Sequence, residues 1–221
     1  MSEGIEGLVP TNDDSSKVIE LLSLISSAVP YLGGPLSNIL SGQLVKRRFE
    51  RVDGCLRNLA TRLDRHQSDV TENYVKTEEF DELLEQTLRR VSEERNEEKR
   101  KLYQSFLYHD ISLPQGQYDD KMKMLRLIEQ VSPRGIMLLK ALNYPPDPNP
   151  PGWGGSPGDT LRRRLDSGIH QYIPELLAEL NRLGMARAGG LNTMMTSGGA
   201  EELHNWIQPL GTELLRFIES P

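Results

Sequence analysis

The sequence predicts a mainly α-helical protein in two halves, with a small β-hairpin in the second half. Apolar residues recur at spacings of three and four along most of the chain, which is the period of an amphipathic helix. Aromatic residues make up only 6% of the sequence, and this favours helix over a sandwich or barrel. Residues 144–158, YPPDPNPPGWGGSPG, hold too many prolines and glycines for helix or inner strand, so we expect a long exposed loop there.

Composition and charge restrict the partners and the compartment of this protein. The sequence has 26 basic and 32 acidic residues, a net charge of −6, so its bulk charge does not attract nucleic acid or anionic lipid. Its one cysteine, Cys55, cannot form an intramolecular disulfide, and the acidic N-terminus lacks the pattern of a secretory signal. We expect a cytoplasmic protein, with a peripheral position at the inner face of the membrane as the alternative.

We expect a flexible polar leader over residues 1–16 and a helical domain over residues 17–124. Within this domain, residues 21–45 carry no charge, and as one helix they would extend about 37 Å, longer than the hydrocarbon core of about 30 Å. Prolines, glycines and several polar residues in the segment argue against a single span. The prediction is a helical hairpin packed in protein, with contacts from Leu32, Leu36, Ile39 and Leu40.

An interfacial hairpin is the alternative for the same segment. Four basic residues follow it closely, Lys46, Arg47, Arg48 and Arg51, and each would contribute about 1 kcal/mol near anionic headgroups. They equally suit salt bridges to acidic residues of the following helices. A membrane-engaging role of residues 21–45 therefore stays open beside the packed hairpin.

A charged helix with one narrow apolar seam begins at Lys46. We call the interaction seam the five residues that recur at spacings of three and four: Phe49, Val52, Leu56, Leu59 and Leu63. We predict that this seam meets a second copy of the chain or a protein partner. Thr77 and Asn96 are predicted to cap two further helices, and another helix is expected from about residue 119 to 130.

The second domain is predicted over residues 125–221. Ser132 and the proline after it are expected to open a helix, as N-cap and first helical residue. Asp159 is predicted to cap the helix that begins TLRRRLDSG, and Gly184 to end a later, leucine-rich helix. The glycine-rich segment after Gly184 predicts the small β-hairpin, and a helix from about residue 210 to 219 is expected at the end.

Two stretches of the second domain carry a resemblance to a known fold. They are Leu180, Leu183, Gly184 and Met185, and then Leu210, Gly211, Leu214, Leu215 and Phe217. They resemble the winged-helix pattern, in which L-x-x-L-G-hydrophobic ends the third helix and L-T-x-x-G-x-x-hydrophobic opens the last one after a wing. Position 209 is Pro, and no Thr lies beside Leu210. The resemblance covers about residues 131–221 and implies a winged-helix-like domain.

The order of segments along the chain carries a second resemblance. An apolar Gly/Pro hairpin, a charged helix, EEKRKLYQSFL and a winged-helix-like end are similar to prokaryotic helical families of unknown function. This resemblance implies a fold and no activity. Some members of those families sit beside phage-defence genes, so the resemblance implies a defence-related role as an expectation.

The sequence holds no catalytic motif that we can locate. It has no P-loop, G-x-G-x-x-G, H-E-x-x-H, C-x-x-C or G-x-S-x-G, and His109 with Asp110 is its one adjacent pair of histidine and acid. Neighbours on a helix point about 100° apart, so this pair is a poor dyad. We therefore predict that the protein is not an enzyme and has no catalytic, cofactor-binding or metal-binding residue.

A basic cluster offers the one candidate contact for nucleic acid or an acidic partner: Arg162, Arg163 and Arg164. A winged helix that reads DNA needs basic and amide groups on its third helix. That helix carries two acids here, Glu175 and Glu179, which would face phosphate.

We therefore expect a non-enzymatic interaction or regulatory module of an intracellular prokaryotic system. Its partner would be another protein or a second copy of the chain, with a dimer as the default. A membrane-engaging effector and a winged-helix transcriptional regulator are the two alternatives.

Overall fold

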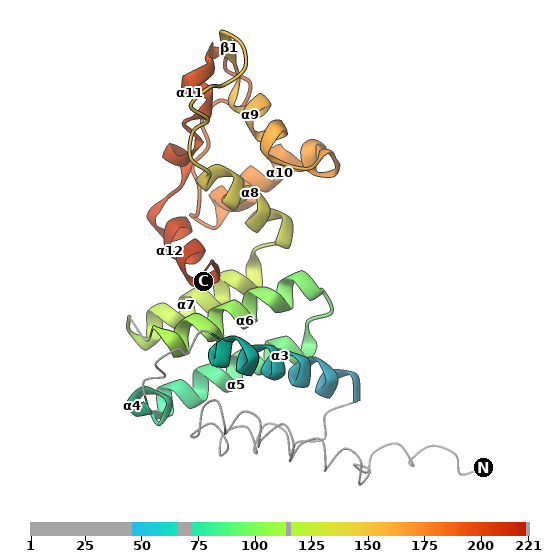
Figure 1. Cartoon of the computed structure of the whole chain (residues 1–221), viewed down its shortest axis with the longest axis vertical. Coiled ribbons are helices and arrows are strands. Elements are labelled where there is room, and N and C mark those ends of the chain that lie inside the picture. Colours follow the sequence, from blue (N-terminus) through green and yellow to red (C-terminus); the bar gives the residue numbers. More distant parts are fainter. Residues whose placement is uncertain (1–45, 66–71, 114–115, 220–221) are drawn as a thin grey trace, which may run out of the picture. The chain divides into compact units, whose positions relative to one another are not determined.

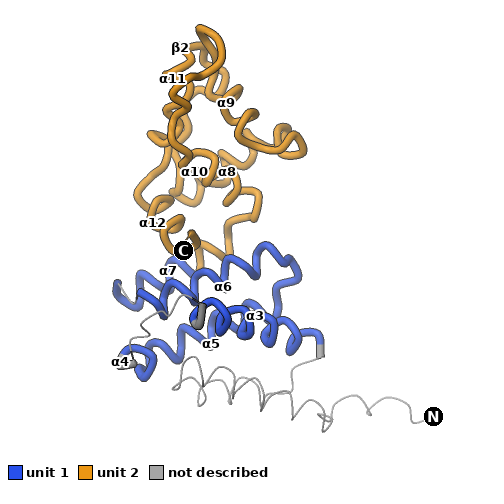
Figure 2. The backbone as a smooth tube through the Cα atoms, viewed as in Figure 1, with its two compact units in different colours: residues 1–125, 220 blue, residues 126–219, 221 orange. Residues whose placement is uncertain are grey.

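The computed structural model describes residues 46–65, 72–113 and 116–219, in two compact units. Unit 1 ends at Leu125, and unit 2 runs from Arg126 to Glu219 (Figure 2). The predicted leader and the predicted hairpin, with Leu32, Leu36, Ile39 and Leu40, lie outside the described residues. The described part is mainly α-helical, as the sequence predicts, with one small antiparallel sheet in unit 2.

Unit 1 is a stack of helices, two of which begin at a side-chain cap (Figure 1). The oxygen of the Thr77 side chain accepts from the N–H of Phe80, and that of Asn96 accepts from the N–H of Lys99. Both predicted caps are thus confirmed, and acidic residues follow each in the first turn, where the helix dipole favours them. The helices are α3 (Lys46–Arg65), α4 (Glu72–Val75), α5 (Glu78–Glu93), α6 (Glu97–Ser112) and α7 (Tyr118–Gln130), which crosses the unit boundary.

The interaction seam lies inside unit 1, which corrects its predicted role. Helix α3 packs against α5 and α6, and four seam residues are at most 4% exposed: Val52, Leu56, Leu59 and Leu63. Phe49 is half-buried. The seam therefore cannot meet a partner while unit 1 is folded, because its period of three and four matches the apolar faces of two helices of the same chain.

A buried ion pair connects α6 to α7 within unit 1. The Lys121 Nζ lies 2.7 Å from Asp110 Oδ1, and both side chains are almost fully buried. The hydroxyl of Tyr74 donates to Asp110 Oδ2 at 2.6 Å and accepts from Lys121 Nζ at 2.7 Å. Burial, and then the charge of Asp110, raises the pKa of Tyr74, so this hydroxyl keeps its proton and remains a donor.

We expect Asp110→Ala to destabilise unit 1 by about 3–5 kcal/mol, because it leaves the Lys121 ammonium buried without a carboxylate. Urea unfolding followed by circular dichroism measures the change. Asp53→Ala is the matched control, since the pair of Asp53 with Arg57 is partly exposed and its loss is expected to cost at most about 1 kcal/mol. Equal losses in the two variants would contradict the role given to Asp110.

Unit 2 is built from short helices whose starts follow the predicted chemistry. Ser132 caps α8, with Pro at the first helical position, as predicted. The cap of α9 is Ser156 and not Asp159, because Asp159 is the N3 residue of a capping box with Ser156. The elements are α8 (Pro133–Asn143), β1 (Gly154–Gly155), α9 (Pro157–Arg164), the 3-10 helix η1 (Ser167–Tyr172), α10 (Ile173–Arg182), β2 (Met195–Thr196), α11 (Ser197–Glu201), the 3-10 helix η2 (Leu203–Trp206) and α12 (Pro209–Ile218).

The small sheet of unit 2 joins two segments that are far apart in the sequence. Strand β1 lies at the end of the Pro/Gly-rich loop and pairs antiparallel with β2, with Gly154 opposite Thr196 and Gly155 opposite Met195. The sheet expected in the glycine-rich segment is present, but only β2 comes from that segment. The other strand comes from residues that the prediction assigned to an exposed loop.

A close backbone approach fixes the path from α10 to α12. Gly184, at φ +70°, ends α10, and the next residues pair with the chain before α12 through a bridge of Ala186 with Ile207. A Cβ on Gly211 would lie 2.3 Å from the carbonyl oxygen of Met185. Only glycine fits here, since no flexible side-chain end could move away from that contact.

Two glycines inside helices predict opposite effects of an added methyl group. A Cβ on Gly54 of α3 meets nothing within 4 Å, so Gly54→Ala should stabilise unit 1 by about 0.5–1 kcal/mol through helix propensity. Gly211→Ala in α12 should destabilise unit 2 by more than about 1 kcal/mol, because the backbone must shift. Chemical denaturation of both variants measures the two signs, and a shared sign would contradict the packing described here.

Candidate functional site

The Pro/Gly-rich loop of unit 2 is fixed to the unit by one arginine. Arg164, at the end of α9, donates from Nη1 to the carbonyl oxygens of Ala141 and Tyr144, at 2.9 and 3.1 Å. Its Nη2 donates to the carbonyl oxygen of Pro145 at 3.3 Å. The guanidinium thus satisfies carbonyls at the end of α8 and the first residues of the loop, and its side chain is only 10% exposed.

A buried carboxylate, that of Glu201, completes this arrangement. Glu201 Oε2 lies 2.7 Å from Arg164 Nη2 and accepts from the N–H of Asp147 in the loop at 3.4 Å. Glu201 Oε1 accepts from the Thr160 hydroxyl at 3.0 Å and from the Arg163 guanidinium. Burial opposes the charge of Glu201, but these donors outweigh it and hold the pKa of the carboxyl below its usual range. We call these residues the Glu201 cluster: Asp147, Thr160, Arg163, Arg164 and Glu201.

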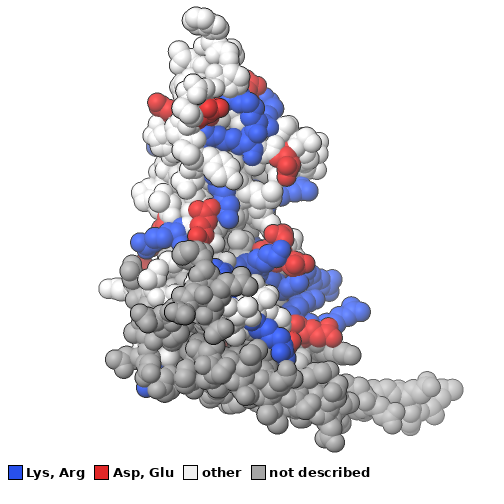
Figure 3. Space-filling view, in the orientation of Figure 1, with Lys and Arg blue, Asp and Glu red and all other residues white. Residues whose placement is uncertain are grey.

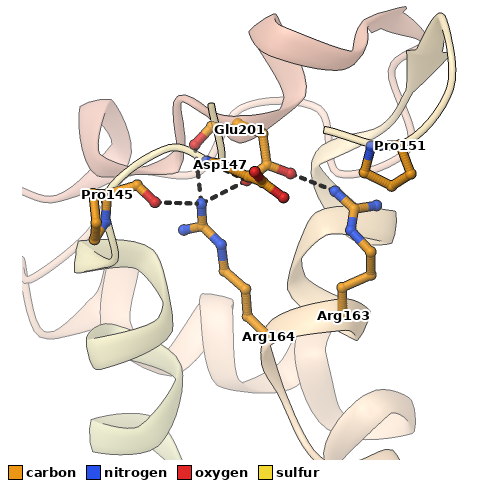
Figure 4. Close-up of a pocket in the computed structure, with 6 residues that line it drawn as sticks. All are labelled: Pro145, Asp147, Pro151, Arg163, Arg164 and Glu201. Atoms are coloured by element: carbon orange, nitrogen blue, oxygen red, sulfur yellow. Dashed lines mark hydrogen bonds and ion pairs between the residues drawn. The ribbon is translucent and has the colours of Figure 1, made fainter. Parts of the chain in front are cut away.

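All members of the Glu201 cluster except Thr160 line a small open pocket of about 340 Å³, together with two prolines of the loop, Pro145 and Pro151 (Figure 4). Both guanidinium groups point toward the carboxylate of Glu201, from neighbouring positions on α9. The carboxylate accepts from several donors and is not positioned as a free base. The arrangement therefore fixes the start of the loop in place.

The Pro/Gly-rich loop exposes a tryptophan to solvent. Trp153 is 99% exposed and stands between Gly152, at φ +77°, and strand β1. The chain on both sides of it is held, by the Glu201 cluster before it and by the pairing of β1 with β2 after it. Most of the surface of a tryptophan is buried in an average protein. Full exposure of Trp153, on a loop held at both ends, therefore marks a candidate contact site.

The three arginines of the predicted basic cluster are all paired within unit 2. Arg162 lies 3.0 Å from Asp159, and Arg163 and Arg164 bind Glu201. The structure thus brings Arg163 and Arg164 together at the carboxylate of Glu201 rather than on a free surface. Their prediction as contacts for nucleic acid or an acidic partner stays a prediction.

Two reactive positions considered from the sequence, Cys55 and the pair His109 and Asp110, lie in unit 1. Cys55 is buried, and burial raises the pKa of its thiol to about 12, so the thiol is protonated at neutral pH. The acid beside His109 is Asp110, which Lys121 and Tyr74 already bind. Among the described residues, we find neither a group of His, Cys, Asp and Glu side chains suited to a metal ion nor a helix long and apolar enough to cross a membrane.

Sequence reasoning missed Glu201 and Trp153. Glu201 lies 41 positions from Thr160 and 54 from Asp147, so no local pattern connects them. The available signal was the tryptophan itself, as one of only two in the chain and placed among prolines and glycines that cannot bury it.

Comparison with known proteins gives no match: no family model, no curated protein and no solved structure is similar to this chain. The assignment of a function therefore depends on the geometry described above.

We expect Glu201→Gln to destabilise unit 2 by about 3 kcal/mol, because two guanidinium groups lose their carboxylate. Both tryptophans lie in unit 2, so tryptophan fluorescence during urea unfolding measures this unit. The neighbouring exposed acid gives the matched control, Glu202→Gln, with an expected change within about 0.5 kcal/mol.

The same variant tests a dependence on pH. The pKa of Glu201 is lower in the folded unit than its ordinary 4.5, so its contribution to stability is complete above that value and declines as pH falls below it. Stability of the wild-type unit should fall more steeply with acid than that of Glu201→Gln. Parallel pH profiles would contradict this assignment.

Proposed function

We propose that this chain is a non-enzymatic interaction protein whose unit 2 docks onto a partner protein through Trp153. The observation that carries the proposal is the almost complete exposure of Trp153 on a loop fixed at both ends. Tryptophan is enriched among the residues that contribute most to binding at protein interfaces, where its ring fills an apolar pocket and its N–H finds an acceptor.

The fixed loop supports this function through the cost of binding. A flexible loop loses conformational entropy when it is ordered on a partner, and this loss weakens the complex. Here Arg164, Glu201 and the two-stranded sheet hold the backbone on both sides of Trp153 before any partner binds. The proposed partner is a protein surface with an apolar pocket of the size of an indole ring.

We propose further that unit 2 is related to the winged-helix class. This is supported by the order of α10, Gly184, the bridge of Ala186 with Ile207, and α12 with Gly211 close to the bridge. Gln208 is the N-cap of α12 and Pro209 its first residue. Proline is favoured at the first helical position, which accounts for Pro209, and the glycine of the pattern, Gly211, falls in the first turn of α12.

Winged-helix domains serve as protein-docking modules as well as DNA readers, and charges on α10 favour docking. Glu179 accepts from the N–H and the hydroxyl of Ser132, so it is committed to the start of α8. Glu175, Asn181 and Arg182 are exposed, a set without net charge. Binding of duplex DNA that is lost in Arg182→Ala would favour the transcriptional regulator instead.

The other alternative, a membrane-engaging effector, depends on residues 21–45, which lie outside the described residues. It therefore stays a prediction, as do the prokaryotic and defence-related setting and the cytoplasmic location.

A photo-crosslinking amino acid at position 153 tests the docking function in cells. We expect it to capture a specific protein, and Trp153→Ala to weaken binding of that purified protein by about 30-fold or more, as at interface hot spots. The same substitutions at Leu113, an exposed apolar residue of unit 1, are the control and should leave affinity within about twofold. A partner captured equally at both positions would contradict docking through Trp153.

A further inference from the structure

A groove between two helices of unit 1 has a charge opposite to that of the whole chain. It has a volume of about 540 Å³ and lies between one face of α3 and the beginning of α6. Five of its lining residues are cationic and two, Glu50 and Glu97, are acidic, in a protein of net charge −6. We call the cationic residues the groove cations: Arg47, Arg51, Arg95, Arg100 and Lys101.

Basic side chains are concentrated on one side of unit 1. In Figure 3, Lys and Arg side chains gather on the right-hand side of unit 1, where Figure 1 shows α3 beginning, with a few acidic ones between them. The lining residues of α3 and those of α6 are at least 39 positions apart in the sequence, so packing of the two helices creates this concentration.

Backbone carbonyls hold two of the groove cations in place, and no carboxylate in the described part of the chain forms an ion pair with either. Arg51 Nη1 donates to the carbonyl oxygen of Ser92 at 2.8 Å, and Arg100 Nη1 donates to those of Glu94 and Arg95, at 3.2 and 2.9 Å. Both side chains are half-buried. Each guanidinium has five N–H donors, so these anchors fix its position while its positive charge and other donors remain available.

Among the described residues, the other groove cations add charge at the rim. Arg47 and Arg95 are exposed and form no ion pair with any of these residues. Lys101 is paired with Glu97 and Glu98. Four guanidinium groups that pair with no carboxylate of the described residues therefore line one groove, and such an arrangement favours an anion.

The uncharged part of the groove lining leaves space for a ligand. Gly54 lies on the groove face of α3, and a Cβ there would meet nothing within 4 Å. The neutral thiol of Cys55 and the amides of Asn58 and Gln104 complete the lining. A volume of this size suits a small molecule or a headgroup, with amides that can bind polar groups beside the anion.

We propose that this groove binds a phosphate-bearing ligand through its guanidinium groups. Arginine matches phosphate with two parallel hydrogen bonds, and two half-buried, anchored arginines lose little freedom on binding. The phosphate group can belong to a soluble molecule or to a lipid headgroup, and the chemistry of recognition is the same. This site is independent of Trp153, so either proposal can fail alone.

Calorimetric titration of the full chain with sodium pyrophosphate, at about 150 mM salt, tests the site. We expect saturable binding that weakens by at least about tenfold in the double variant Arg47→Glu, Arg95→Glu, because both side chains line the groove. Arg48→Glu is the matched control: Arg48 is exposed, adjacent in sequence and outside the groove lining, and its variant should bind within about twofold of wild type.

Gly54→Leu gives a second variant that acts by shape alone. Its side chain would occupy the groove without a clash at the Cβ, so binding should be lost while circular dichroism shows the fold retained. Absence of pyrophosphate binding would overturn the proposal. Equal weakening by Arg48→Glu would also overturn it, since it would indicate general surface charge.

Vesicles separate the two sources of phosphate. We would compare co-sedimentation with phosphatidylcholine vesicles with and without phosphatidic acid. Association that needs phosphatidic acid, is lost in Gly54→Leu and is displaced by pyrophosphate assigns the site to a lipid headgroup. Pyrophosphate binding without vesicle association assigns it to a soluble phosphate, and vesicle association that survives Gly54→Leu without any pyrophosphate binding overturns the proposal.

Discussion

The ion pairs of Glu201 are the constraint on which the rest of unit 2 depends. One buried carboxylate holds two arginines of α9, the hydroxyl of Thr160 and the backbone of the Pro/Gly-rich loop. Because a buried charge is costly unless it is fully paired, these groups have one favourable arrangement. The start of the loop is therefore held against unit 2 although it has few apolar residues to bury, and the pairing of β1 with β2 holds the chain directly after the exposed Trp153.

Unit 1 depends mainly on apolar packing between its helices, and its buried polar groups lie beside that apolar core. Val52, Leu56 and Leu59 of α3 are enclosed by α5 and α6, and the Asp110–Lys121 pair is buried beside that core. On the outer face of α3 the same packing brings cations of α6 beside cations of α3. A chain with excess acid can thus hold a strongly basic groove, because local arrangement and not composition sets the local field.

Features that depend on neighbours in sequence could be predicted, and those that depend on distant residues could not. The caps at Thr77, Asn96 and Ser132 follow from residues within three positions. The seam was recognised as apolar, but its spacing does not say whether the facing surface belongs to the same chain. Strand β1 has two glycines, whose partners lie 42 and 40 positions away, and no periodicity indicates such a pairing. The Glu201 cluster and the basic groove likewise join residues about 40 or more positions apart.

The rate at which Cys55 is chemically modified can measure how often α3 separates from α6. It is the one cysteine of the chain, and it lies beneath the groove, buried where α3 packs on α6. Alkylating reagents need an accessible thiolate, and burial denies both conditions in the closed state. Its rate of modification therefore equals the equilibrium constant for opening multiplied by the rate for a free thiol, when reclosing is fast. A single reaction thus reports how often these helices separate, without any substitution in the chain.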